Sequence, residues 1–160
     1  NYEDTDFAML FDGWCYMGWS GMNPGVKTVV ENPYNSMLVK IDQQNLGMVI
    51  QKICIYSALN TREGIVRAKY EYRHGELMIT IEDSGNGMDA QALQKAFERF
   101  AREDNGENSG TGLDLPIVKE LVEQMNGAIE LESEPGKGST FFVSIPCEMT
   151  SMEKKSEIII

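Results

Sequence analysis

A predicted strand that ends in a carboxylate and a two-glycine turn is the feature that most restricts how this chain can fold. Residues 76–82 alternate polar and apolar side chains, which predicts a strand with one buried face. Asp83 follows directly, and Gly85 and Gly87 allow a turn that a ligand can approach closely. A carboxylate placed there can accept hydrogen bonds from the exocyclic amine of a flat ring. Taken alone, the motif is equally an Asp-Gly turn that only ends a strand.

A second glycine stretch lies downstream, and together the two stretches indicate a ligand site rather than a simple turn. Residues 109–117 contain Gly110, Thr111, Gly112 and Leu113 and open a segment with helical apolar periodicity, residues 115–125. A glycine loop that leads into a helix N-terminus is a common geometry for holding phosphate. The stretch is not a dinucleotide fingerprint, because its third glycine is missing, and it is not a Walker loop, because no Lys-Ser/Thr pair follows.

In this order, the motifs resemble the ATP-binding domain shared by sensor histidine kinases, gyrase-type topoisomerases, mismatch-repair ATPases and heat-shock chaperones. Residues 43–60 are similar to the N box of that superfamily, Asp83-x-Gly85-x-Gly87 to its G1 box, residues 97–100 to its F box and residues 110–113 to its G2 box. The ending, residues 132–146, resembles the histidine-kinase branch specifically. The resemblance covers residues 37–146.

The periodicity along the chain predicts strands at 26–31, 37–41, 64–72, 76–82, 128–134 and 139–145, and helices at 43–60, 88–100 and 115–125. The resemblance implies an α/β (α+β) two-layer sandwich of the Bergerat type. It would contain a mixed, mostly antiparallel sheet of about five strands, with three helices on one face. We expect three segments: 1–25 packing on or leading into the domain, 26–147 forming the ATP-binding domain, and 148–160 forming a tail.

The first segment carries an aromatic helical face made of Phe7, Leu10, Phe11 and Trp14. We interpret this face as core, and we expect the segment to meet the more open face of the sheet. The alternative is that the two tryptophans of this segment mark a surface for chain that lies upstream.

Charge and composition exclude several classes of partner. The net charge of -11 argues against a nucleic-acid surface, and no apolar run is long enough to cross a membrane. Cys15, Cys54 and Cys147 are odd in number and lie in apolar contexts, so we expect reduced, buried thiols. These features suit a cytoplasmic domain without membrane contact of its own, and they leave open a membrane anchor elsewhere in the parent protein. His74 lies on a polar turn, so we do not expect it to accept phosphate.

The resemblance implies a nucleotide site in which Asp83 accepts from the adenine amino group and Ser139 shares a water with it. Gly87 would let the ring pack closely, with Met88 and Ile117 as its walls. Arg102 occupies a place where the family often has a basic residue that reaches toward phosphate, although it is equally a surface arginine. The nucleotide-binding residues implied in this way are Asp83, Gly85, Gly87, Met88, Arg102, Gly110, Thr111, Gly112, Leu113 and Ser139.

The chain departs from the family pattern at the expected phosphate end. Alignment of the N box puts Tyr56 where the family has the asparagine that ligates Mg²⁺, with Lys52 one turn earlier and Asn60 one turn later. A neutral phenol is a poor ligand for this ion, so Mg²⁺ is a doubtful cofactor while ATP remains the expected one. Asp114 replaces the last glycine of the G2 box and brings a negative charge toward the phosphates. Both departures would affect the phosphates rather than adenine.

We therefore predict the ATP-binding catalytic domain of a two-component sensor histidine kinase. It would present the γ-phosphate to a phosphoacceptor histidine on a dimerisation domain of the same parent protein, act with a response regulator, and handle Mg-phosphate poorly. The alternative is a pseudokinase module that regulates by contact. A chaperone-like or repair-type ATPase is a third class, and the acidic charge and the kinase-type ending count against it.

Overall fold

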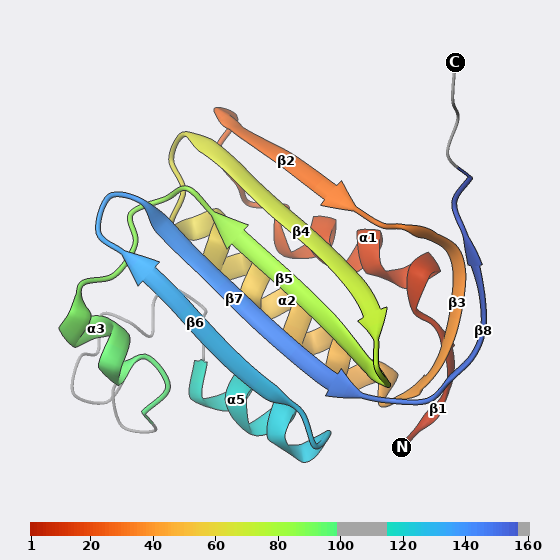
Figure 1. Cartoon of the computed structure of the whole chain (residues 1–160). Helices are drawn as coiled ribbons and strands as arrows, with labels where there is room; N and C mark the ends of the chain where they lie inside the picture. The colour runs from red at the N-terminus through yellow and green to blue at the C-terminus, as the bar shows by residue number, and fades with distance from the viewer. Residues whose placement is uncertain (99–114, 157–160) are drawn as a thin grey trace.

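The computed structural model of the chain describes residues 1–98 and 115–156, and its strands form two sheets (Figure 1). The strands are β1 (Glu3–Asp6), β2 (Val26–Glu31), β3 (Tyr34–Ile41), β4 (Gly64–Arg73), β5 (Glu76–Asp83), β6 (Ala128–Glu134), β7 (Gly138–Pro146) and β8 (Met149–Lys154). The helices are α1 (Phe7–Gly18), α2 (Gln43–Leu59), α3 (Ala90–Lys95) and α5 (Leu115–Gln124).

The larger sheet has five strands in the order β2-β4-β5-β7-β6. Only the β2–β4 pair is parallel, so the sheet is mixed and mostly antiparallel, as predicted. Helices α1, α2 and α5 lie side by side on one face of this sheet, which confirms the two-layer sandwich (Figure 1). The core fills the space between the two layers, and its largest fully buried side chains are Phe7, Phe11, Met37, Ile41, Leu46, Ile50, Ile53, Leu77, Ile79, Ile81, Phe141 and Ile145.

Local sequence signals account for the ends of several elements. Asp42 caps α2, because its carboxylate accepts from the Asn45 N–H at 3.1 Å. The hairpin between β4 and β5 turns at His74 and Gly75, whose φ angles of 55° and 79° suit a tight turn. His74 is exposed, as predicted. The helix expected over 88–100 is shorter in the described part of the chain, where α3 ends at Lys95.

The consecutive strands predicted at 26–31 and 37–41 belong to different sheets. β2 pairs with β4, whereas β3 forms a separate three-stranded sheet in the order β1-β3-β8. β1 and β8 both pair antiparallel with β3, from opposite sides. This small sheet draws one strand from each of the three predicted segments, whose boundaries stay a prediction.

The N-terminal segment packs on the helical side of the sheet, not on its open face as expected. Phe7 and Phe11 meet the ring of Tyr70 edge-on at centroid distances of 4.7 and 4.8 Å. Gly18 and Gly47 let α1 and α2 come close together, since a Cβ on Gly18 would stand 2.6 Å from the Cys54 Cβ. The interpretation of the aromatic face as core is confirmed, with Leu10 only partly buried.

The thiols follow the prediction in part. Cys15 and Cys54 are buried free cysteines between α1 and α2, whereas Cys147 is half-buried. Burial raises the pKa of both Cys54 and Cys147. Within the described residues, no helix is long and apolar enough to cross a bilayer.

Candidate functional site

Asp83 is a buried carboxylate at the last position of β5. Its Oδ1 accepts from the Gly85 N–H at 2.9 Å, whereas Oδ2 is buried without a partner. Burial raises the pKa of Asp83 from its ordinary value of 3.8 to about 6, although hydrogen bonds from the backbone of Gly85 and Ser139 lower it and the charge of Glu82 raises it. A buried polar atom without a hydrogen bond costs folding free energy. Oδ2 is therefore a free acceptor to which a ligand could donate.

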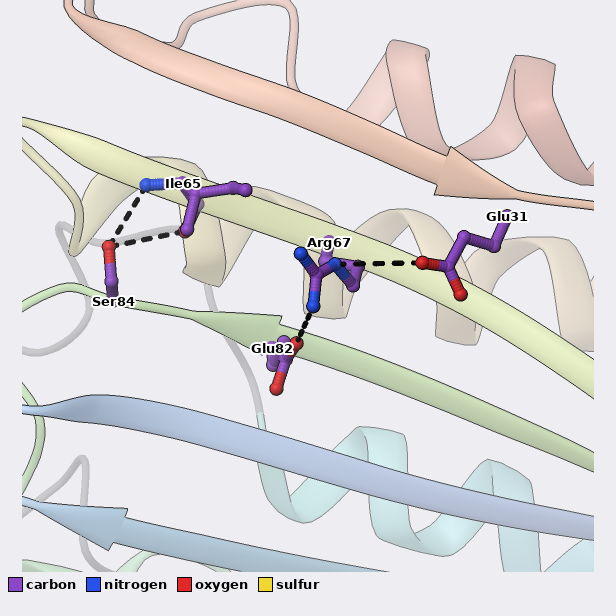
Figure 2. A network of polar contacts seen from close by, with 5 residues as sticks. All are labelled: Glu31, Ile65, Arg67, Glu82 and Ser84. Atoms are coloured by element: carbon purple, nitrogen blue, oxygen red, sulfur yellow. Dashed lines mark hydrogen bonds and ion pairs between the residues drawn. The ribbon is translucent and has the colours of Figure 1, made fainter.

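The turn after Asp83 is fixed to the start of β4. Figure 2 shows the Ser84 hydroxyl beside the backbone of Ile65, whose N–H donates to it at 2.9 Å. The Ser84 N–H donates to the Ile65 carbonyl at 3.0 Å. Gly64 makes this contact possible, because a Cβ there would lie 2.2 Å from the Ser84 hydroxyl.

Three glycines let separate backbones meet around the turn. A Cβ on Gly85 would stand 2.0 Å from the Asn60 carbonyl oxygen, and one on Gly87 would stand 1.8 Å from the Glu134 carbonyl oxygen. A Cβ on Gly138 would reach 1.9 Å from the Asp83 carbonyl oxygen. The turn therefore packs against the end of α2 on one side and the β6–β7 hairpin on the other.

Serine side chains join this hairpin to the turn. The Ser133 and Ser139 hydroxyls lie 2.8 Å apart on paired positions of β6 and β7. The Met88 N–H donates to the Ser133 hydroxyl at 2.8 Å. Ser139 itself pairs with Asp83 in the sheet, so the structure brings these two predicted site residues together.

Thr61, directly after the C-cap of α2, adds a second unpartnered polar atom. Its side chain is fully buried, and its Oγ1 has no hydrogen-bond partner. A Cβ on Gly85 would lie 2.9 Å from this oxygen, so Thr61 faces the same turn as Asp83. An unpartnered acceptor and an unpartnered hydroxyl at the same turn fit a ligand that offers both a donor and an acceptor.

The Tyr56 side chain points to this same place. It is buried, packs edge-on against the Phe141 ring at 5.4 Å, and has its hydroxyl near the Ser139 side chain. Burial raises the pKa of Tyr56, the nearby Ser139 hydroxyl lowers it, and the charge of Asp83 raises it. The sequence placed Tyr56 at the phosphate end, whereas the structure places its hydroxyl beside Ser139 and Asp83.

The other two N-box residues, Asn60 and Lys52, differ in whether their side chains are bonded within the chain. The Asn60 side chain donates to the Tyr56 carbonyl at 2.9 Å, so it turns back along α2. Lys52 is half-buried one turn before Tyr56. Neither forms part of a carboxylate, histidine or cysteine cluster, because the described residues contain no such group of three that could hold a metal.

Part of the predicted site lies outside the described residues. Arg102, Gly110, Thr111, Gly112, Leu113 and Asp114 all fall within 99–114, as do the last two residues of the F box. The two predicted wall residues, Met88 and Ile117, are described and are half-buried. Phe97 packs on the core, with the Lys119 ammonium 5.9 Å from its ring centroid.

A hollow of about 410 Å³ lies at this turn, and Asp83, Ser84, Ser133 and Ser139 are among the residues that line it. Ile65, Glu82, Glu132, Lys137 and Thr140 also contribute to its lining, and Glu82, Thr140 and Glu132 are paired neighbours on the face of the sheet opposite the helices. Arg67 spans this face between Glu82, at 3.1 Å, and Glu31, at 3.8 Å (Figure 2). Strand alternation puts the Asp83 side chain on the helical side instead.

Two residues of this site were missed in the sequence analysis. Thr61 was not named as a site residue, although its place directly after α2 puts it next to the turn. Ser133 was not considered. A hairpin that turns at residues 135–137 places Ser133 opposite Ser139. The strand register could therefore have predicted that Ser133 lies at the site.

Residues 41–149 match the model of the histidine kinase-, DNA gyrase B- and HSP90-like ATPase family. The sensor protein EvgS of Escherichia coli K12 is 35% identical over 130 residues, 75% of this chain and 11% of that protein. The sensor protein GacS of Pseudomonas syringae pv. syringae is 33% identical over 125 residues, 73% of this chain and 14% of that protein. The chain thus spans a small part of the length of its curated relatives.

Solved structures with the same fold include full-length ShkA in complex with AMPPNP, with a TM-score of 0.72 and 21% identity over 98% of this chain and 32% of that one. The catalytic domain of the histidine kinase ThkA has a TM-score of 0.66 and 17% identity over 91% of this chain and 95% of that one. The family match, the sensor-kinase relatives and the shared architecture agree with one another. The chain belongs to the histidine kinase-, DNA gyrase B- and HSP90-like ATPases, as an ATP-binding catalytic domain of the sensor histidine kinase type.

Proposed function

We propose that this domain holds an adenine nucleotide mainly through the base and handles Mg-phosphate poorly. The observation that carries the proposal is the pair of unpartnered buried atoms, Asp83 Oδ2 and Thr61 Oγ1, on either side of Gly85. An exocyclic amine can donate to the carboxylate while a ring nitrogen accepts from the hydroxyl, directly or through water.

The base end of the site would be completed by this chain's own groups. Gly87 keeps its Cα face free of a side chain, and Met88 and Ile117 stand where the walls of the pocket are proposed. The hydroxyls of Ser139 and Tyr56 add polar partners beside Asp83. Arg102 and residues 110–113 are proposed to face the phosphates, on the strength of the family motif.

Three features weaken the phosphate end. The Tyr56 position supplies no Mg²⁺ ligand, because its hydroxyl lies beside Ser139 and Asp83 and burial raises its pKa above the ordinary value of 10.0, which keeps it a neutral phenol, whereas Mg²⁺ prefers charged or strongly polar oxygen ligands. The Asn60 amide is already bonded to the Tyr56 carbonyl. Asp114 adds a like charge, and at about 4 Å with an effective dielectric near 20 the repulsion is about 4 kcal/mol. In a complete site, Mg²⁺ would supply neutralisation of phosphate charge.

Two roles for the parent protein follow from this proposal. In the first, the domain is the catalytic half of a cytoplasmic sensor kinase. It would present the γ-phosphate to a histidine on the dimerisation domain of the same parent, which then passes phosphate to a response regulator. In the second, the domain is a pseudokinase that signals by contact. The Tyr56 and Asp114 positions favour the second role.

Calorimetric titration of the purified domain separates the two roles. The ligands are a non-hydrolysable ATP analogue, with and without Mg²⁺, and adenosine. We expect weak binding that Mg²⁺ does not strengthen, with adenosine nearly as good as the analogue. The matched variant Asp83→Asn should abolish binding of both ligands.

A double variant tests the reason for weak phosphate handling. Tyr56→Asn combined with Asp114→Gly should make binding of the analogue stronger in the presence of Mg²⁺. Micromolar, Mg-dependent binding by the unaltered chain would contradict the proposal and identify a working kinase half. No gain in the double variant would refute the roles given to Tyr56 and Asp114.

A further inference from the structure

The hydroxyl of Ser133 on β6 has every partner that a hydroxyl can have. The Met88 N–H donates to its Oγ at 2.8 Å. The same Oγ lies 3.0 Å from the Gly138 carbonyl oxygen and 2.8 Å from the Ser139 Oγ. A serine hydroxyl donates one proton and accepts two, so these three contacts use all of its capacity.

Only one arrangement of protons makes all three contacts hydrogen bonds. The Gly138 carbonyl can only accept, so Ser133 donates its single proton to that oxygen. Ser133 then has no proton left for Ser139, and the contact between the two hydroxyls is a hydrogen bond only if Ser139 donates. The Ser139 proton is therefore directed toward β6.

The lone pairs of Ser139 remain for the site. Ser139 and Asp83 are paired neighbours on β7 and β5, and both side chains are buried on the helical side of the sheet. Among the described residues, Asp83 Oδ2 has no partner. The Tyr56 hydroxyl lies near Ser139 and can use one of its lone pairs, which leaves the other for a ligand. Two acceptors thus lie together, with no proton from Ser139 between them.

We propose that Ser133 sets the specificity of this site for an amino group, because it holds the Ser139 proton away from the ligand. The inference rests on the proposed binding of the base at Asp83. A 6-aminopurine can donate two N–H protons to the two acceptors, whereas a 6-oxopurine presents only lone pairs at the same position. Ser133 is a positioning residue, since it acts through Ser139.

The same selection works through a bridging water. A water between Asp83 and Ser139 would donate one proton to each of them, because both can only accept. Such a water has only lone pairs left for the ligand, so it accepts from an amine and rejects a carbonyl oxygen. The specificity therefore does not depend on whether the base touches Ser139 directly.

Backbone packing fixes the three partners of Ser133 relative to one another. Ser133 and Ser139 occupy paired positions in the β6–β7 ladder. Gly138 has a φ of 112°, and a Cβ there would stand 1.9 Å from the Asp83 carbonyl oxygen, so the start of β7 lies directly against the end of β5. The direction of the Ser139 proton is thus decided by the sheet itself.

Replacing Ser133 with alanine should release the Ser139 proton. The nearest free acceptor is Asp83 Oδ2, and Ser139 can then donate to it or to the ligand. The preference for adenosine over inosine should fall about tenfold, which corresponds to about one hydrogen bond. The pKa of Asp83, about 6 in the unaltered chain, should fall by about one pH unit, because a hydrogen bond to the anion stabilises it.

Calorimetric titration with adenosine and inosine measures the preference. It is run at about pH 8, above the Asp83 pKa of about 6, so that the carboxylate is ionised. The Thr61 hydroxyl both donates and accepts, so it does not discriminate between the ring nitrogens of the two ligands. The matched control is Ser144→Ala, which removes a half-buried serine from the opposite face of β7 and should keep the preference.

A second measurement needs no ligand. NMR titration of the Asp83 carboxyl carbon should show the lower pKa in Ser133→Ala. The double variant Ser133→Ala, Ser139→Ala should not show it, because no hydroxyl proton is left to donate to Asp83. A merely structural effect of losing Ser133 would appear in both variants alike, while Tyr56 and Glu82, the other groups that affect the Asp83 pKa, are unchanged in both.

The outcomes separate this inference from the proposed function. An unaltered chain that binds inosine as well as adenosine overturns the inference, and so does a Ser133→Ala variant with the full preference. An Asp83 pKa that stays unchanged in Ser133→Ala, or falls equally in the double variant, overturns the arrangement of protons. Failure of the unaltered chain to bind adenosine refutes the proposed function and the specificity with it, whereas the ligand-free titration still decides the role of Ser133.

Discussion

Replacing Asp83 with asparagine should make the folded domain more stable at neutral pH. The change keeps the size of the side chain and the oxygen that accepts from the Gly85 N–H. It removes the buried negative charge whose Oδ2 has no partner. The carboxylate proposed to bind the base therefore destabilises the fold, and its removal should stabilise it.

The magnitude follows from the pKa of Asp83, which burial raises from 3.8 to about 6. Between these two values the folded chain holds a proton that the unfolded chain has released. Stability from this group therefore falls as the pH rises through that window. A shift of about two units corresponds to about 3 kcal/mol at neutral pH, of which about 1.4 kcal/mol develops between pH 5 and pH 7.5.

Urea denaturation of the unaltered chain and of Asp83→Asn at these two pH values measures this contribution. The difference between the two free energies of unfolding should grow by about 1.4 kcal/mol from pH 5 to pH 7.5. Other carboxylates titrate in both proteins and cancel in the difference. A difference that stays constant with pH would refute the reasoning, and a difference that shrinks would show that Asp83 is stabilised as the anion.

Four further substitutions test the framework of the fold. Gly87→Ala should prevent folding, because its Cβ would stand 1.8 Å from the Glu134 carbonyl oxygen. Gly136→Ala has open space around it and should cost only about 1–2 kcal/mol of stability for its positive φ. The yield of folded protein and urea titration distinguish the two variants. Asp42→Ala removes the cap of α2 and should lower the free energy of unfolding by about 1 kcal/mol in the same titration. Arg67→Met should change it by less than about 1 kcal/mol, since both ion pairs of Arg67 are partly exposed.

Local patterns were enough to predict most elements of the larger sheet. Alternation between residues 76 and 82 and the turn at His74 and Gly75 specify the β4–β5 hairpin, since both signals lie close together in the chain. The small sheet was not predicted, because β3 pairs with strands that no local signal connects to it. β8 in particular has a polar sequence without a buried face.

In the candidate site, too, local sequence predicted some features and distant contacts decided the others. Asp83 and Ser139 were expected to lie together, and strand pairing places them opposite one another. The direction of the Tyr56 side chain was not predictable from its place in the N box. A helix position specifies a face, whereas Phe141 and Ser139 on a distant strand decide where the ring and its hydroxyl settle.

The small sheet has a consequence for how the chain is made. β3 is synthesised early, but its partner β8 follows more than a hundred residues later. During that interval β3 presents an open edge whose Met37 and Val39 belong in the core, and such edges invite pairing with other chains. The domain therefore reaches its protected form only when its last strand has left the ribosome, and chaperone binding during synthesis should concentrate on β3.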